Sequence, residues 1–359
     1  MTKLARKSNK ELIYEVLIDP DRKSLLNMIS DIFTLIIYQK KLPIHYFGKY
    51  LFKKGKTNIK DYFPDDFLYY KFKPLLNEHA VSEVVENKLF FNFYYSQFNI
   101  NLPKTLMFNF RNVFVKNNMN FEITCVSDFV LKLNEIFSHN PTYDSIIVKR
   151  TYGSYGGEQV FKIYKHQTSS ENEQISKLYS IVIKTGFIFQ ETIIQHPKLN
   201  KLNPSCLNTI RFDTFIDKEG KIDIISAYIR MSIKNQPIDN ISSGGCQVGI
   251  QLKTGKLKKF GYQGFRTSGT LIYTSHPITK TIFEEFEIPY FEEAKELVLK
   301  TAGCMPGLRL VGWDVAIGLK GPVLIEGNAD YEMAGNDLSE DGYRTNATFK
   351  KMMDELNYK

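Results

Sequence analysis

The sequence lacks the short motifs that assign several common chemistries. It has four cysteines, and no two of them form a Cys-x-x-Cys pair, so neither a zinc ribbon nor a dithiol redox site is expected. No His-Glu-x-x-His pattern and no Gly-x-Ser-x-Gly elbow occur, which argues against a zinc protease and an α/β hydrolase. The Gly55-Lys56 and Gly255-Lys256 stretches lack the upstream glycine of a phosphate-binding P-loop, so a Walker NTPase is not expected.

Long hydrophobic runs are also scarce. The longest, Leu25 to Tyr38, is interrupted by Ser30 and Asp31 and is shorter than the ~20 residues that span a bilayer. No signal peptide opens the chain, and the low cysteine count suits a reducing compartment. We therefore expect a cytoplasmic protein, either free or resting on the inner face of the membrane.

Acidic residues are sparse in one part of the chain. Residues 1–60 hold 13 of the 47 Lys and Arg but only 5 of the 39 Asp and Glu, so the whole net charge of +8 lies there. Such a segment attracts anionic lipid, acidic glycan or nucleic acid, and it is equally typical of a plain solvated surface. Nucleic acid is the least expected partner, because residues 61–359 carry no net charge and no RNA- or DNA-reading motif.

The apolar content is sufficient for a sizeable core, at 43% hydrophobic and 14% aromatic residues, which excludes a disordered chain. Residues 11–100 show helical spacing, and short strands with glycine turns dominate after residue 121. The pattern predicts helices at 171–185 and 290–301, strands at 145–149, 159–164 and 187–194, and hairpins at 208–231, 247–262 and 310–326. Hairpins mixed with helices predict an α+β architecture with antiparallel sheets.

The first candidate site is a lysine at a strand end followed by a glycine-rich loop. Lys149 is followed by Tyr152, Gly153, Ser154, Gly156 and Gly157. Glycines let backbone N–H groups approach a phosphate chain closely, and the lysine adds a compact positive charge. Taken alone, the same residues favour an ordinary hairpin loop with an exposed lysine, because glycine-rich loops are common.

The second candidate site is a set of oxygen ligands on the last hairpin. If both segments are strands, Asp314 lies close to Glu326 across the ladder, and Asn328 faces the same side as Glu326. Two carboxylates and an amide suit Mg²⁺ whose remaining ligands are triphosphate oxygens. The alternative is a polar solvent-facing hairpin, which the neighbouring Trp313 and Leu324 make less attractive.

Two further patterns are weaker. An apolar strand carries polar side chains at Gln190 and Glu191. Such a strand can form hydrogen bonds with the edge of an adenine base. Arg211 and Arg230 lie on hairpin strands, and the guanidinium fork suits phosphate or carboxylate recognition. Either arginine alone would be read as a surface ion pair.

Together these sites resemble the ATP-grasp superfamily. The stretches Gln195-His196-Pro197, Asn208-Thr209-Ile210-Arg211 and Gly312-Trp313-Asp314, with Glu326-Gly327-Asn328, are similar to the sugar-transfer-associated ATP-grasp family. The resemblance implies two α+β lobes that clasp ATP, preceded in the sequence by a basic helical N-terminal region. It divides the chain into a helical region at 1–110, a small lobe with the glycine-rich loop at 111–192 and a large lobe with the metal site at 193–359.

The resemblance also implies residue roles. Lys88 and Lys149 would contact the nucleotide phosphates, although the family more often has Asp where Asn87 precedes Lys88. The loop of Tyr152, Gly153, Ser154, Gly156 and Gly157 would close over the triphosphate, and Gln190, Glu191 and Ile193 would surround the adenine. Arg211 and Arg230 would face the γ-phosphate or the substrate carboxylate, and Asp314, Glu326 and Asn328 would hold Mg²⁺.

The implied activity is an ATP-dependent carboxylate–amine ligase that works through an acyl phosphate. The expected substrate is a cell-surface polysaccharide or its precursor, such as an acidic glycan or a lipid-linked sugar, joined to an amino compound. Three alternatives stay open: an ATP-grasp kinase using Asp213, Asp217 or Asp239 as a base, a nucleotide-binding scaffold without turnover, and a non-catalytic polyanion-binding protein. Residues 1–60 are expected to contact the membrane surface or the substrate.

Overall fold

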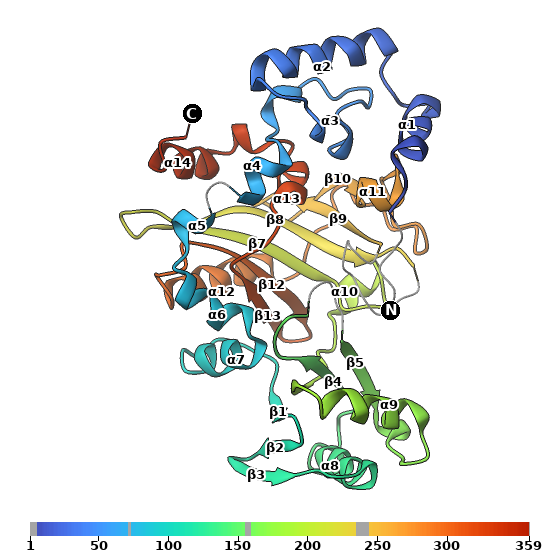
Figure 1. The fold of residues 1–359 in the computed structure, drawn as a ribbon, viewed down its shortest axis with the longest axis vertical. Helices are drawn as coiled ribbons and strands as arrows, with labels where there is room; N and C mark the ends of the chain where they lie inside the picture. Colours follow the sequence, from blue (N-terminus) through green and yellow to red (C-terminus); the bar gives the residue numbers. More distant parts are fainter. Residues whose placement is uncertain (1–5, 71–72, 155–158, 235–243, 359) are drawn as a thin grey trace.

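The computed structural model describes residues 6–70, 73–154, 159–234 and 244–358, and these form two antiparallel sheets with helices around them (Figure 1). The smaller sheet has the strand order β3-β2-β1-β6-β4-β5. Its strands are β1 (Thr105–Phe110), β2 (Val113–Lys116), β3 (Met119–Glu122), β4 (Ser145–Arg150), β5 (Val160–Tyr164) and β6 (Gly186–Glu191). Helices α8 (Val126–His139) and α9 (Glu173–Val182) bury their apolar faces against it.

The larger sheet has the strand order β11-β10-β9-β8-β7-β12-β13. Its strands are β7 (Thr209–Ile216), β8 (Ile222–Ser232), β9 (Gly245–Ile250), β10 (Leu257–Tyr262), β11 (Ile272–Tyr273), β12 (Leu310–Gly318) and β13 (Gly321–Asn328). The β7–β8 turn closes because the Asp217 carboxylate accepts hydrogen bonds from the backbone N–H groups of Glu219 and Lys221. Gly220 supplies the positive φ that this turn requires.

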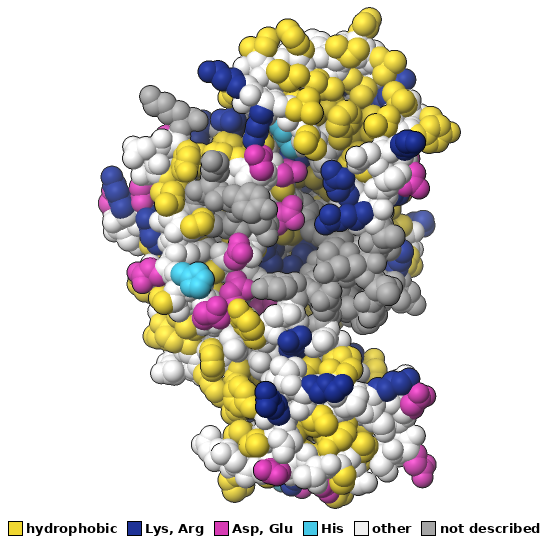
Figure 2. All heavy atoms as spheres, viewed as in Figure 1, with side chains coloured by type: hydrophobic (Ala, Val, Ile, Leu, Met, Phe, Trp, Pro, Cys, Tyr) yellow, Lys and Arg dark blue, Asp and Glu magenta, His cyan; other side chains and the backbone are white. Residues whose placement is uncertain are grey.

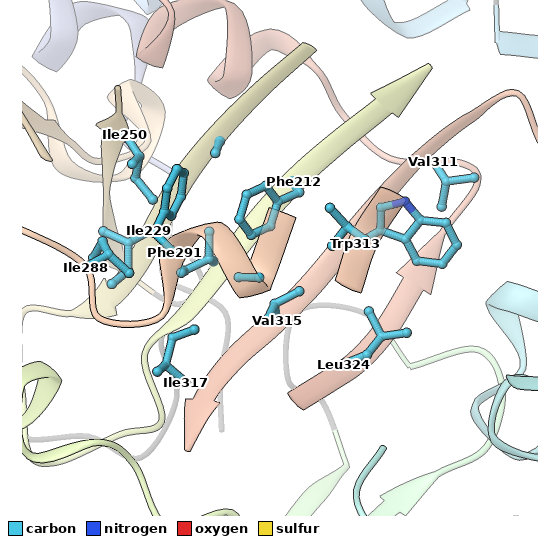
Figure 3. Close-up of a cluster of buried hydrophobic side chains, with 14 of the residues drawn as sticks. Phe212, Ile229, Ile250, Ile288, Phe291, Val311, Trp313, Val315, Ile317 and Leu324 are labelled. Carbon is cyan, nitrogen blue, oxygen red and sulfur yellow. The ribbon is translucent and has the colours of Figure 1, made fainter. Parts of the chain in front are cut away.

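Alternation along these strands gives the larger sheet two different faces. Phe212, Trp313 and Val315 point into a core that α12 (Phe291–Gly303) covers (Figure 3). Their neighbours Arg211 and Asp314 therefore point to the opposite face, since successive side chains of a strand alternate. That opposite face carries the polar side chains on which the candidate site depends.

The N-terminal helices pack on the larger sheet and its C-terminal extension. They are α1 (Asn9–Ile18), α2 (Leu25–Gln39), α3 (His45–Gly48), α4 (Asp65–Tyr70), α5 (Lys73–Leu76), α6 (His79–Glu86) and α7 (Lys88–Ser96). Shorter helices α10 (Pro197–Asn200), α11 (Phe265–Ser268), α13 (Ala334–Ser339) and α14 (Ala347–Glu355) complete the fold. One apolar cluster joins residues of the α2–α3 region to Tyr262 and Leu338, so the N-terminal helices share a core with the large lobe.

The expected elements are largely present, with differences at their ends. The α+β class with antiparallel sheets is confirmed. The strand expected at 187–194 ends at Glu191, because Ile193 and its neighbours leave the sheet on the way to α10. Strand β1 pairs with β6, so the smaller sheet begins at Thr105, ahead of the predicted lobe boundary at 110.

A buried ion pair fastens the N-terminal region to the large lobe. The Lys49 ammonium pairs with the Asp337 carboxylate, and the two side chains are 2% and 0% exposed. Lys49 also donates to the Phe63 carbonyl at 2.6 Å, and Asp337 accepts from the Phe63 backbone N–H at 3.1 Å. Three hydrogen-bonded groups thus tie α3 and the segment before α4 to α13.

Replacing Lys49 with methionine should destabilise the protein by about 3–5 kcal/mol, because it leaves the Asp337 carboxylate buried without its cation. Urea unfolding measures the change. The matched control is Lys54→Met, at an exposed lysine of the same segment, with an expected loss below about 0.5 kcal/mol. Equal losses in the two variants would contradict this role for the pair.

Candidate functional site

A cavity of about 1410 Å³ lies where the two sheets and the N-terminal helices meet. Strands β4 and β6 of the smaller sheet, β7, β8, β12 and β13 of the larger sheet, and helices α1 and α2 all contribute to its lining. Figure 2 shows Lys and Arg side chains inside the hollow at the centre of the view. Its lining by both lobes makes this cavity the candidate active site.

The two expected phosphate lysines both line this cavity. Lys149 lies on β4, and Lys88 begins α7. The Lys88 backbone N–H donates to the carbonyl of Thr151 just after β4, at 2.8 Å. Asn87 caps α7 by accepting from the N–H groups of Leu89 and Phe90. The asparagine that departs from the family pattern therefore has a clear structural role as a helix N-cap.

Lys149 has an altered proton affinity. Its pKa is lowered to about 8, mainly by burial; the Glu326 carboxylate opposes this change, and the nearby Lys88 ammonium adds to it. Near neutral pH the ammonium form still predominates, so the side chain remains a cation in a desolvated place. A bound phosphate would favour the charged form and raise this pKa again.

Asp314 holds the two expected arginines in place. Its carboxylate accepts from Arg211 Nε at 2.5 Å and Nη2 at 3.2 Å, and it pairs with Arg230 Nη2 at 2.6 Å. Burial alone would raise the pKa of Asp314, but the two guanidinium groups outweigh it and hold the pKa below its ordinary value. Asp314 is therefore ionised, and its first structural role is to orient two cations toward the cavity.

The strand register explains this cluster. Asp314 lies opposite Arg211 in the β7–β12 pairing, and Thr209 lies opposite Arg230 in the β7–β8 pairing. The Thr209 hydroxyl accepts from Arg230 Nη2 at 2.7 Å. A Cβ atom at Gly312 would come within 2.9 Å of Arg211 Nη1, so the glycine leaves room for the guanidinium.

The expected magnesium ligands lie together on the last hairpin. Asp314 and Glu326 face each other across the β12–β13 ladder, as the spacing predicts, and both line the cavity with Asn328. Glu326 is 3.4 Å from the Lys88 ammonium, and the Asn328 amide donates to the Gly312 carbonyl at 3.5 Å. Glu326 and Asn328 thus offer oxygen atoms that suit Mg²⁺ shared with phosphates, while Asp314 is already paired with the arginines.

Of the three residues expected to surround the adenine, two line the cavity. Glu191 and Ile193 line it, but Gln190 lies outside the lining, with its amide donating to the Pro103 carbonyl at 3.4 Å. The Glu191 carboxylate accepts from the Lys104 backbone N–H and from the Tyr143 hydroxyl, both at 2.9 Å. Glu191 is therefore fixed in orientation, and its contact with adenine stays a prediction.

Two residues of the glycine-rich loop also line the cavity. Gly153, at a φ of 69°, and Ser154 line the cavity. Tyr152 is about half exposed, is not part of the lining, and donates to Glu83 at 3.4 Å. Gly156 and Gly157 lie outside the described residues, so closure of the loop over a triphosphate stays a prediction.

Sequence reasoning missed Glu86 and Tyr331, which both line the cavity. Burial raises the pKa of Glu86, whose carboxylate accepts from the backbone N–H groups of Ala329 and Asp330 at 2.8 and 3.0 Å. Glu86 thereby fixes the chain just after Asn328. The Arg211 guanidinium lies 5.3 Å from the centre of the Tyr331 ring, a cation–π contact. Neither residue belongs to a recognisable motif.

Two of the three bases considered for a kinase, Asp213 and Asp217, do not line this cavity. Asp213 is fully buried, with its carboxylate accepting from Ser226 at 2.6 Å and from Tyr343 at 3.1 Å. Asp217 belongs to the β7–β8 turn and pairs with Lys351. Neither lines the cavity, and Asp239 lies outside the described residues.

A model of the sugar-transfer-associated ATP-grasp family matches residues 68–348. The chain belongs to this family. The match covers both sheets and the four cavity-lining residues Lys88, Lys149, Arg211 and Arg230, which we call the cation cluster. It does not include α1 or α2. None of the curated proteins searched matches the sequence. Among the described residues of this ATP-grasp protein, no helix is both long and apolar enough to cross a membrane.

Solved structures with a similar arrangement are distant in sequence. D-alanyl-alanine synthetase A from Vibrio cholerae is 14% identical with a TM-score of 0.44, covering 76% of this chain and 65% of its own. A D-cycloserine synthetase is 11% identical with a TM-score of 0.45, covering 78% and 72%. D-alanine–D-alanine ligase from Bacillus anthracis in complex with ATP is 13% identical with a TM-score of 0.39, covering 78% and 66%.

The depressed pKa of Lys149 predicts a pH-dependent nucleotide affinity. ATP binding should weaken as the pH rises through about 8, because the anionic phosphates favour the protonated lysine and its proton is lost above that pH. Titration calorimetry at several pH values measures this. In Lys149→Arg the guanidinium stays charged, so the affinity should become nearly independent of pH. An unchanged pH profile in this variant would contradict the assignment.

Proposed function

We propose that this protein is an ATP-dependent ligase that joins a carboxylate to an amine through an acyl phosphate. The observation that supports it best is that all four expected substrate-binding cations, Lys88, Lys149, Arg211 and Arg230, line one cavity. The described lining of the cavity contains no cysteine or histidine, which favours chemistry that needs alignment and charge neutralisation rather than a protein nucleophile.

In the proposed reaction, a substrate carboxylate oxygen attacks the γ-phosphorus of ATP, and the bond to the β-phosphate oxygen breaks. The amine nitrogen then attacks the acyl carbon, loses a proton, and inorganic phosphate leaves. Lys88 and Lys149 bind the phosphate chain, while Arg211 and Arg230 face the γ-phosphate or the substrate carboxylate. Asp314 keeps both guanidinium groups oriented, so alignment of the reactants is set before they bind.

The remaining roles follow the same geometry. Ile193 and Glu191 line the adenine end, with Gln190 behind them, and the loop from Tyr152 to Gly157 covers the phosphates. Glu326 and Asn328 would hold Mg²⁺, which when bound neutralises charge on the phosphoryl oxygens. Asp314 would join them as a ligand only by giving up part of its pairing with Arg211 and Arg230. In the structure Lys88 neutralises Glu326 at 3.4 Å, so this lysine is placed to exchange the carboxylate for a phosphate oxygen.

For the substrate we propose an acidic sugar of a cell-surface polysaccharide or its precursor, joined to an amino compound. The family description associates these proteins with sugar transfer, and the basic charge of residues 1–60 suits an acidic partner. The kinase alternative is less well supported, because Asp213 and Asp217 lie away from the cavity.

Product analysis tests the proposed reaction. The full chain is incubated with Mg-ATP, a panel of uronic acids and hydroxylamine, which traps an acyl phosphate as a hydroxamate. The proposal expects ADP, free phosphate and a hydroxamate in equal amounts. ADP without free phosphate, together with a phosphorylated sugar, would identify a kinase instead. An absence of both ATP turnover and ATP binding would favour the polyanion-binding alternative.

Loss of Lys149 or of Glu326 should reduce the rate of hydroxamate formation by on the order of a hundredfold or more. A single well-placed charged or hydrogen-bonding group contributes about 2.7–4 kcal/mol to such a barrier. The variants are Lys149→Ala and Glu326→Gln, and the control is Lys320→Ala, at an exposed lysine in the turn of the same hairpin as Glu326. Wild-type rates in both site variants would refute the roles given to these residues.

A further inference from the structure

Helices α1 and α2 carry an unusual number of exposed apolar side chains. On α2, Leu26, Ile29 and Phe33 are 79%, 63% and 63% exposed, and Ile37 continues the same stripe at helical spacing. The opposite side of α2 is apolar as well and is buried through Met28 and Leu35. In Figure 2, hydrophobic side chains gather over these helices at the top of the view.

The stripe opposite the buried side of α2 is thus apolar and has no covering element, and an apolar helix face is normally buried in a core or in lipid. With 15 residues, α2 is too short to span a bilayer. It can instead lie in the interface with its outer side among the acyl chains.

Basic residues lie at the ends of the two helices that carry this apolar surface. Arg6 and Lys10 lie before and at the start of α1, and Lys40 ends α2; all three are exposed. Within the described part of the chain, none of these three forms an ion pair. Cations next to an exposed apolar face are complementary to anionic headgroups above acyl chains. A second copy of the chain fits less well, since pairing these faces would bring like charges together.

The apolar surface continues into the active-site cavity. Ile13, Leu17, Leu42 and Ile44 are each exposed to solvent and also line the cavity. Deeper in the same wall lie Leu12, Val16 and Met28, and beyond them the cavity reaches the cation cluster. The cavity therefore has an apolar entrance at α1 and α2 and an interior lined by charged side chains of both signs, with Arg211 and Arg230 among them.

We propose that the outer face of α1 and α2 docks on an anionic lipid bilayer, so that an acceptor carried on a lipid enters the cavity between these helices. The docking step follows from the surface alone. Delivery of a lipid-borne acceptor rests on the proposed ligase function, and it would place the hydrocarbon chain along the apolar entrance and the acidic group at Arg211 and Arg230.

Vesicle co-sedimentation of the full chain tests the docking step. One set of vesicles is phosphatidylcholine alone, and the other is an equimolar mixture with phosphatidylglycerol. We expect clear binding to the anionic vesicles, weakened by added salt, and little binding to the neutral ones. The same low recovery with both vesicle types would overturn the proposal.

The variant Ile29→Glu/Phe33→Glu should reduce vesicle affinity by about tenfold or more, because two apolar side chains no longer enter the lipid. The matched control is Leu131→Glu, at a 61% exposed leucine on α8 of the small lobe, and it should bind vesicles like the wild type. Lys10→Gln/Lys40→Gln should lower the preference for anionic vesicles. Equal binding by wild type and the Ile29→Glu/Phe33→Glu variant would place lipid contact elsewhere.

Mg-ATP thermal stabilisation of the same proteins separates docking from nucleotide binding. Neither Ile29 nor Phe33 lines the cavity, so all variants should retain the wild-type stabilisation. Retained stabilisation with no vesicle binding by the wild type would reject docking and leave the ligase proposal intact.

Sedimentation velocity tests whether a second copy of the chain covers this face instead. If the wild type is a dimer that does not bind vesicles, and the Ile29→Glu/Phe33→Glu variant is a monomer, the face belongs to a second copy and the proposal is overturned.

Discussion

The ion pairs of Asp314 with Arg211 and Arg230 are the interaction on which the site depends. Three neighbouring strands, β8, β7 and β12, each contribute one of the three side chains, so the sheet itself sets their positions. Lys88 and Lys149 line the same cavity, where Lys88 pairs with Glu326. Cations held in fixed positions on a sheet favour an anionic ligand.

The two faces of the larger sheet have different roles: one packs in the core, and the other carries the polar side chains of the candidate site. Trp313, Val315 and Phe212 anchor the strands in the core under α12, and this leaves the alternate positions free for polar groups. The N-terminal helices then cover that polar face, through the Lys49–Asp337 pair and a shared apolar cluster. This cover turns an open sheet face into a cavity with one charged and one apolar region.

Much of this arrangement could be predicted from the sequence. The hairpins, the opposition of Asp314 and Glu326, and the lysine at the end of a strand follow from alternation and turn residues, which are local properties. The pairing of Asp314 with both arginines could not be predicted, because it depends on β7 lying between β8 and β12. Glu86 and Tyr331 carry no motif, and they reach the cavity only through tertiary packing.

The sequence also shows that the positive charge lies in residues 1–60, but it does not show that an exposed apolar face lies next to this charge. Residues 1–60 could be identified as basic, yet the apolar face of α1 and α2 emerges only once the buried sides of these helices are known. The long apolar run at 25–38 reads equally well as a core helix. Its exposure depends on what the rest of the chain leaves uncovered.

The central claim is that the cation cluster binds the terminal phosphates of ATP. Calorimetric titration of the full chain with Mg-ATP and, separately, with AMP tests it most directly, because AMP keeps the adenosine but lacks the β- and γ-phosphates. The account predicts that ATP binds at least about a hundredfold more tightly than AMP, as expected for several charge-assisted hydrogen bonds to phosphate. Equal affinities for the two nucleotides, or no binding of ATP, would contradict it.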